Sequence, residues 1–223
     1  MPQVLGWIYF CWLFNGIELF KDIYPSFFLL RVLCFFISLI SISAFGYLLN
    51  DWCDVKTDAA TGKVNHLSNL KPVWRFMVVV TPLIIGCVFW LPVSKIATAL
   101  FVLQIIALIA YSVPPVRLKA RSFWGVAADA FYGHINPVFI TLFAFDFFGG
   151  DEIRHKILLA AVLLPAILFK GVRNILLHQL DDRKSDQKAG IKTFVVKNGA
   201  LFTLNFINNL LPFEIFLSIL LSL

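Results

Sequence analysis

Long apolar segments separated by short polar loops run through almost the whole chain. Each is close to the roughly 20 residues that a helix needs to cross the hydrocarbon core of a bilayer. The segments are continuous runs of Leu, Ile, Phe and Val, without the alternation of barrel strands, so they predict helices. We therefore expect an all-α, polytopic transmembrane helical bundle that forms a single membrane domain over residues 1–223. About seven spans are predicted, at about 4–20, 24–49, 74–93, 96–113, 125–148, 156–180 and 200–223.

Composition supports lipid as the solvent of this fold. The chain is 60% hydrophobic and 14% charged, with a mean hydropathy of +0.84. Ordinary soluble domains are about 45–50% apolar and about 25% charged. The four cysteines form no CxxC pair, so neither a zinc site nor a disulfide framework is indicated.

The positive charge follows the loops. The chain carries 19 Lys and Arg against 13 Asp and Glu, a net charge of +6. Most of these cations follow the second, fourth and sixth predicted spans, which argues against nucleic-acid binding and fits the positive-inside rule. We predict an integral membrane protein surrounded by lipids, with these loops on the cytoplasmic side. The sequence leaves the oligomeric state open.

A first polar motif ends the second predicted span. Asn50, Asp54 and Asp58 are spaced by four residues, which places them on one helical face, and Asp51 lies beside them. Like charges at this spacing repel one another, whereas a divalent cation would neutralise them. Magnesium, bound through carboxylates, water and phosphate, fits this set of oxygen ligands. The alternative is a solvated helix end at which Asp and Asn act as caps.

A second motif follows the sixth predicted span. Asp182 and Asp186 repeat the four-residue spacing on the same predicted side of the membrane. Two facing sets of carboxylates predict a cradle for magnesium and a diphosphate, in which metal ions join carboxylate and phosphate oxygens.

A basic loop follows the fourth predicted span. Pro114 and Pro115 end a helix and stiffen the turn that follows. Cations beside a metal-diphosphate site would bind phosphate oxygens, Arg as a fork and Lys as a point charge. A basic loop alone is also what the positive-inside rule produces. The three cations of this loop are Arg117, Lys119 and Arg121.

Together the three motifs resemble the UbiA superfamily of intramembrane prenyltransferases. The resemblance covers roughly residues 24–200, and the order and predicted membrane side of the motifs also match. The matching residues are Asn50-Asp51-x-x-Asp54-x-x-x-Asp58, then Tyr111-Ser112-x-Pro114-Pro115-x-Arg117-Leu118-Lys119, then Asp182-x-x-x-Asp186 followed by Gly190-Ile191-x-Thr193.

The resemblance implies an enzyme that transfers a prenyl group from an isoprenoid diphosphate held by Mg²⁺ to an aromatic or other lipophilic acceptor. Asp54, Asp182, Arg117 and Lys119 would be catalytic, with Lys119 and Arg121 also binding substrate. Asn50 and Asp51 would contribute to substrate binding. The metal ligands would be Asn50, Asp54, Asp58, Asp182 and Asp186.

The chain also departs from the family pattern. Members commonly have about nine spans, so the roughly seven predicted here suggest a short form that lacks about two C-terminal helices. Some relatives carry a further aspartate three residues before the second DxxxD, where this chain has Gln179. This substitution predicts a different arrangement of the metal ligands.

Polar residues also occur within the fifth and sixth predicted spans. Ionisable groups at such depth are costly and ordinarily face a cavity or one another, so we predict that they line the substrate pocket. An ion pair from Asp129 to Lys170 or Arg173 is the structural alternative. The predicted pocket residues are Asp129, Tyr132, Asn136, Lys170, Arg173, Asn174 and His178.

Other functions remain open at this stage. A terpene cyclase would trap the prenyl cation within the same molecule, and a related enzyme would prenylate a sugar phosphate. A non-catalytic lipid-binding or transport protein would use the same buried charges without chemistry.

Overall fold

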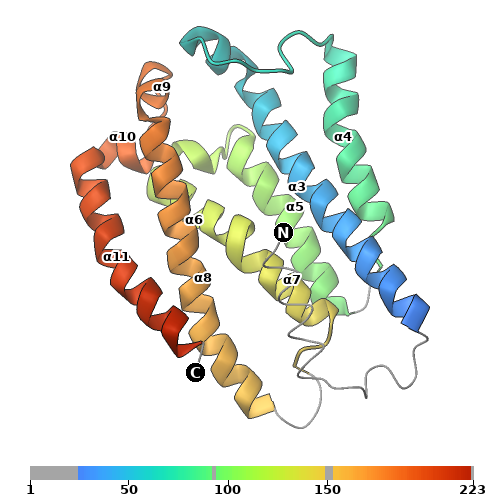
Figure 1. The fold of residues 1–223 in the computed structure, drawn as a ribbon. Helices are drawn as coiled ribbons and strands as arrows, with labels where there is room; N and C mark the ends of the chain where they lie inside the picture. Colours follow the sequence, from blue (N-terminus) through green and yellow to red (C-terminus); the bar gives the residue numbers. More distant parts are fainter. Residues whose placement is uncertain (1–24, 92–93, 149–152, 222–223) are drawn as a thin grey trace.

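A computed structural model describes residues 25–91, 94–148 and 153–221, and within these ranges the regular elements are all helices (Figure 1). The predicted span at 4–20 lies outside the described residues. The bundle is built from two long helices, α3 (Pro25–Thr61) and α8 (Ile153–Asp181), with shorter helices around them. In Figure 1 the C-terminal ends of both long helices lie at the upper end of the bundle.

Helix α3 continues well past the predicted span at 24–49. Its 37 residues extend about 55 Å at the usual rise of a helix, more than the roughly 30 Å of a hydrocarbon core. The additional turns carry Asn50, Asp54 and Asp58, so the predicted helical spacing of the first motif is confirmed. The helix ends at Thr61, and Gly62 follows with a φ of 78°, a left-handed conformation that favours glycine.

Helix α4 (Pro72–Val88) returns beside α3 and packs tightly against it. Pro72 begins the helix, where the missing N–H is not needed. The Ser38 hydroxyl donates to the Gly86 carbonyl oxygen at 2.7 Å, and a Cβ at position 86 would lie 2.7 Å from Ile42. Small residues that allow this close approach are typical of helix pairs in membranes.

Helix α5 (Lys95–Ser112) occupies the fourth predicted span. The Ser94 hydroxyl caps its N-terminus by accepting a hydrogen bond from the Ala97 N–H. The helix ends at Ser112, before the two prolines of the basic loop, as the sequence predicts. This end brings the loop to the same end of the bundle as the first motif.

The fifth predicted span, 125–148, is not a single helix. The segment forms α6 (Phe123–Ala130), a turn of π-helix η2 (Phe131–Ile135) and α7 (Asn136–Ala144). The Gln104 amide of α5 donates to the Tyr132 carbonyl oxygen at 2.8 Å, and the Asn136 amide donates to Gln104 Oε1 at 2.8 Å. Hydrogen bonds from α5 therefore support the backbone where the regular helical ladder is interrupted.

The last third of the chain contains α8, two short helices and α11 (Ala200–Leu220). The short helices are α9 (Arg183–Lys188) and α10 (Phe194–Asn198). Helix α11 packs along α8, and only Thr203 and Ile207 of its residues are buried. The two helices are joined by Arg173, which donates two hydrogen bonds to Glu214, at 2.7 and 2.9 Å.

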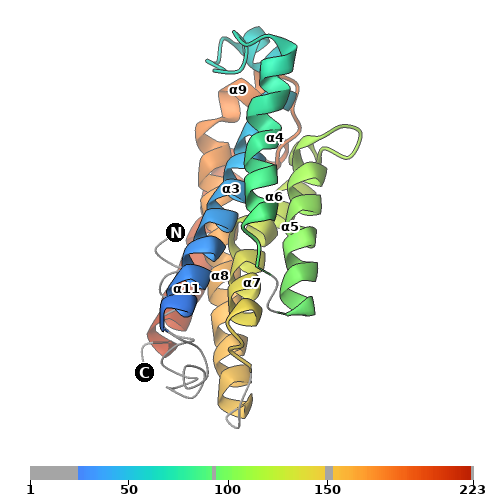
Figure 2. The same ribbon diagram turned by 90° about the vertical axis from the view of Figure 1, so that its right-hand side faces the viewer.

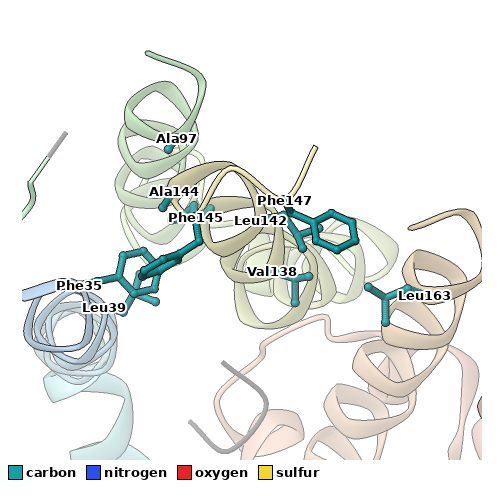
Figure 3. Close-up of a cluster of buried hydrophobic side chains, with 10 residues drawn as sticks. Phe35, Leu39, Ala97, Val138, Leu142, Ala144, Phe145, Phe147 and Leu163 are labelled. Atoms are coloured by element: carbon teal, nitrogen blue, oxygen red, sulfur yellow. The ribbon is translucent and has the colours of Figure 1, made fainter. Parts of the chain in front are cut away.

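The largest of three buried apolar clusters lies toward the end of the bundle opposite the motifs, and the other two continue toward the motif end. Figure 3 shows Phe35 and Leu39 of α3 against Phe145, with Leu163 of α8 on the far side of α7. Four helices of the described residues, α3, α5, α8 and α11, are long and apolar enough to cross a membrane, while α4 is shorter. The predicted all-α, membrane-capable fold is confirmed, whereas the prediction of about seven spans is not.

The ion pair between Arg173 of α8 and Glu214 of α11 predicts that this contact stabilises the packing of α11 on α8. Replacing Arg173 by leucine leaves the Glu214 carboxylate without its partner, at a cost of about 3 kcal/mol, the penalty for a charged group in hydrocarbon. We expect a lower melting temperature for Arg173→Leu in detergent. The double variant Arg173→Leu, Glu214→Leu should recover it, because replacing a pair of charges by apolar groups is often neutral. No recovery would contradict a role for the pair in stability.

Candidate active site

Three segments far apart in the sequence meet at the motif end of the bundle. They are the last turns of α3, the loop after α5, and the junction of α8 with α9 (Figures 1 and 2). Contacts between side chains join all three. Arg117 of the loop pairs with Asp54 of α3, and Lys63, which follows α3, lies 3.5 Å from Asp182.

Asp54 is the centre of the first motif. Arg117 Nη2 donates to its Oδ1 at 2.9 Å, and Lys119 Nζ donates to its Oδ2. Lys119 also donates to Asn50 Oδ1 at 2.6 Å. The Lys119 and Asp54 side chains are only 10% and 14% exposed, so these charges are largely removed from water. Burial lowers the pKa of Lys119, and the Asp54 carboxylate opposes that shift.

The shape of the basic loop places these two cations. Arg117 has a φ of 35°, and the short 3-10 helix η1 (Leu118–Ala120) that follows carries Lys119 inward. Gly125 of α6 packs on this turn, because a Cβ there would lie 2.9 Å from the Leu118 carbonyl oxygen. Arg121 instead is exposed and donates to the Pro115 carbonyl oxygen at 3.0 Å, so it closes the loop and does not contact Asp54.

The second motif lies opposite. Asp182 directly follows α8 as the N-cap residue of α9, and Asp186 lies one turn further, in α9, where its side chain interacts with that of Thr193. Burial, together with the neighbouring Asp182 carboxylate, raises the pKa of Asp186 to about 6. Lys63 and Lys119 interact electrostatically with Asp186 and also with Asp51 of the first motif. The two lysines are therefore near both carboxylate groups, Lys63 in contact with Asp182 and Lys119 with Asp54.

Sequence reasoning missed two residues of this region. Asn65 donates to Asp58 Oδ2 at 2.7 Å and to the Asp51 carbonyl oxygen at 2.8 Å, and so fixes the end of the first motif. From the sequence alone, Lys63 is only one of the cations that follow the second predicted span. Their place in the loop directly after the motif was the only sequence signal available.

Gln179 also has a role that the sequence did not indicate. Its Oε1 accepts hydrogen bonds from the N–H groups of Phe194 and Val195, at 3.1 and 3.4 Å. Thr193 precedes these residues and is paired through its backbone with Ser122, at the start of α6. Gln179 thus holds the start of α10 against α8 and stabilises the segment that contacts Asp186.

The predicted pocket residues divide into two groups. Asn136 is fully buried and donates to Leu100 and Gln104, so it is a packing residue with no exposed surface for a substrate. Arg173 pairs with Glu214 on the α11 side of α8, so the alternative pairing of Asp129 with Arg173 is wrong.

The second group stays available to a ligand. Asp129 and Tyr132 are joined by a hydrogen bond of 2.5 Å and are only partly buried. Lys170, Asn174 and His178 follow one another at four-residue spacing along α8, which leads toward Asp182. Asn174 and His178 are exposed.

The oxygen ligands fit magnesium held jointly by protein and substrate. Among the described residues, no three His, Cys, Asp or Glu side chains are gathered closely enough to hold a metal ion by themselves. Mg²⁺ ordinarily binds through one or two carboxylates together with water and phosphates, so a complete protein cage is not needed. Both Asp54 oxygens accept hydrogen bonds from cations here, which an anionic substrate would attract.

Fold and site together define an integral membrane protein whose helices gather carboxylates and cations at one end. The model of the UbiA prenyltransferase family matches residues 19–223, and the chain belongs to this family. No curated protein matches the chain.

Among solved structures, the chain is similar to a UbiA homolog from Archaeoglobus fulgidus bound to DMAPP and Mg²⁺. The TM-score is 0.66 at 18% sequence identity, and the match covers 85% of this chain. The chain spans 65% of the length of that homolog. This likeness confirms the fold.

The raised pKa of Asp186 predicts how magnesium binding depends on pH. Because a metal ligand must be deprotonated, a carboxyl group with a pKa of about 6 loses its affinity for Mg²⁺ as the pH falls below that value. An ordinary aspartate would stay charged to about pH 4. Titration of the full chain with Mg²⁺ by calorimetry should show weaker binding at about pH 5 than at about pH 7. Asp186→Asn should bind more weakly and lose most of this dependence, and constant affinity in the unmodified chain would contradict the prediction.

Proposed function

We propose that this chain is a magnesium-dependent prenyltransferase that moves a prenyl group from an isoprenoid diphosphate to an aromatic or other lipophilic acceptor within the membrane. The observation that carries the proposal is the pairing of Arg117 and Lys119 with Asp54 and Asn50, opposite Asp182 and Asp186. Membership of the UbiA prenyltransferase family supports the same reaction.

The two cations paired with Asp54 suit a diphosphate leaving group. When the bond between the prenyl carbon and the diphosphate oxygen breaks, negative charge grows on the diphosphate. Arg117 offers a planar fork of N–H donors and Lys119 a compact charge, and both bind phosphate oxygens well. They already lie in a partly dehydrated site, where such interactions are stronger than in water.

The oxygen ligands are assigned to metal binding. In this proposal Asn50, Asp54, Asp58, Asp182 and Asp186 hold Mg²⁺, and Asp51 supports the first motif. When bound, magnesium would neutralise part of the negative charge on the departing diphosphate. The Archaeoglobus fulgidus homolog bound to DMAPP and Mg²⁺ supports this assignment. Asn65 orients Asp58 through a hydrogen bond, and Thr193 lies near Asp186.

The acceptor is assigned to the region beside Asp129, where η2 packs against α8. Asp129 and Tyr132 offer hydrogen bonds from one side, and Lys170, Asn174 and His178 from the other. Such groups suit a hydroxyl or acidic headgroup. The acceptor would then lie deeper in the membrane than the diphosphate.

Full-length protein in lipid nanodiscs tests the proposal. Dimethylallyl, geranyl, farnesyl and geranylgeranyl diphosphates are supplied with Mg²⁺ or with EDTA, together with a panel of phenols and glycerol or sugar phosphates. We expect magnesium-dependent release of diphosphate and a prenylated acceptor. A cyclic hydrocarbon formed without acceptor would identify a cyclase, and a prenylated sugar phosphate would identify the other alternative enzyme. Absence of diphosphate release with all four donors would overturn the proposal.

A further inference from the structure

Asp129 is a carboxylate inside the helical bundle whose partner is a hydroxyl group. Tyr132 Oη donates to Asp129 Oδ1 at 2.5 Å. In the described part of the chain Asp129 forms no salt bridge, in contrast to Glu214, which is held by Arg173. An intramembrane carboxylate is costly, so one that is not neutralised by an ion pair is a candidate for function.

A second tyrosine lies beside this pair, toward the diphosphate site. The rings of Tyr111 and Tyr132 meet edge to face with centroids 5.1 Å apart. Tyr111 lies in the last turn of α5, directly before the basic loop. It is near enough to interact electrostatically with Asp129 and also with Asp54 and Asp186 of the two motifs.

The second oxygen of Asp129 is open. Among the described residues Oδ2 accepts no hydrogen bond, and its near neighbour on η2 is Gly133, where even a Cβ would lie 3.8 Å away. Glycine at this position places no side chain over Oδ2. The titratable groups that face Asp129 are His134 of η2, His178 of α8, and the two tyrosines.

We propose that Asp129 is the base that takes the proton from the acceptor during prenyl transfer, with Tyr132 and Tyr111 as positioning residues. The inference rests on the proposed function. The bond from the prenyl carbon to the diphosphate oxygen breaks, and its electron pair leaves with the diphosphate. The acceptor atom forms the new bond to the prenyl carbon. The bond from that atom to hydrogen then breaks, its electron pair stays with the acceptor, and the proton passes to Asp129 Oδ2.

Tyr132 and Tyr111 prepare the carboxylate for this step. With Tyr132 donating to Oδ1, the carboxylate is held in one orientation and Oδ2 stays directed to the acceptor space. The π-turn η2 begins two residues after Asp129 and contains Tyr132. A regular helix would rotate the residues after Tyr132 relative to Asp129, because a π-turn contains more residues than an α-turn.

Asp129→Asn in the full-length protein tests the inference, with the donor and acceptor that the unmodified protein uses. We expect kcat to fall by about 100-fold or more, the usual contribution of a general base. The KM for the prenyl diphosphate and the binding of Mg²⁺ with dimethylallyl diphosphate should be unchanged. Asp129→Glu should restore part of the activity. Tyr132→Phe should lower kcat less and shift the acid limb of its pH profile.

Asp146→Asn provides the matched control, because the same substitution is made at an exposed residue just after α7, outside the proposed site. Asparagine also tolerates the positive φ of 48° at that position. Unchanged kcat and pH profile in Asp129→Asn, with the unmodified protein active, would overturn this inference and leave the proposed function intact. If Asp129→Asn is misfolded, the pH profile of kcat for Tyr132→Phe becomes the test. A profile like that of the unmodified protein would then overturn the inference. Failure of the unmodified protein to transfer any prenyl group would overturn both.

Discussion

Asp54→Ala is expected to lower prenyl transfer by about 1000-fold or more. Asp54 anchors both Arg117 and Lys119, and we assign it to magnesium as well. Its removal weakens the charge stabilisation of the departing diphosphate, which is worth several kcal/mol, and about 1.4 kcal/mol corresponds to a tenfold change in rate. Steady-state transfer in nanodiscs measures the effect.

The fold should tolerate this change. Asp54 lies in the turns of α3 beyond the predicted span, so Asp54→Ala should be produced and inserted with an unchanged elution profile. Lys56→Ala is the matched control, because Lys56 is exposed two residues away on the same helix and has no role in the proposed site. Transfer by Asp54→Ala at the rate of the control would refute the assignment of the first motif.

Asp182→Ala is expected to lower transfer by about 100-fold to 1000-fold. Asp182 lies 3.5 Å from Lys63 and is the first carboxylate of the second motif. Its loss removes a proposed metal ligand. It also leaves the positive charge of Lys63 without its carboxylate partner beside the site, and this charge favours binding of free diphosphate over turnover. We expect the required Mg²⁺ concentration to rise, as measured by the rate across a magnesium titration.

The adjacent carboxylate gives a sharp control for this experiment. Asp181 is exposed and ends α8, so Asp181→Ala removes the same charge from the same helix end without entering the site. Its activity should be close to that of the unmodified protein. Equal losses in both variants would show that the helix end, and not the Asp182 carboxylate, supports transfer.

The helices themselves were largely predictable. A span needs a continuous apolar run, and that run is a local property of the sequence, so α3, α4, α5, α8 and α11 occur where hydropathy places them. The prediction of a single span at 125–148 was wrong for a reason that lies outside this segment. Hydrogen bonds from Gln104 of α5 to the Tyr132 carbonyl and to Asn136 support the π-turn, and no pattern within 125–148 contains this information.

The candidate site was predictable in part for the same reason. Spacing along one helix fixed the common face of Asn50, Asp54 and Asp58, because helix geometry relates residues four apart. Spacing could not assign partners between helices. Arg173 was predicted to line the pocket but forms an ion pair with Glu214. Arg121 was predicted to bind substrate but donates a hydrogen bond to the Pro115 carbonyl oxygen within the basic loop.

The sequence by itself determined that this chain is a helical membrane protein with two carboxylate motifs and a basic loop, since apolar length, helical spacing and charge are read along one dimension. Only the tertiary structure decided that Arg117 and Lys119 converge on Asp54, that Lys63 bridges to Asp182, and that Tyr111 and Tyr132 lead to Asp129. These contacts join residues that are distant in sequence, and they depend on how the helices pack, which local spacing does not encode.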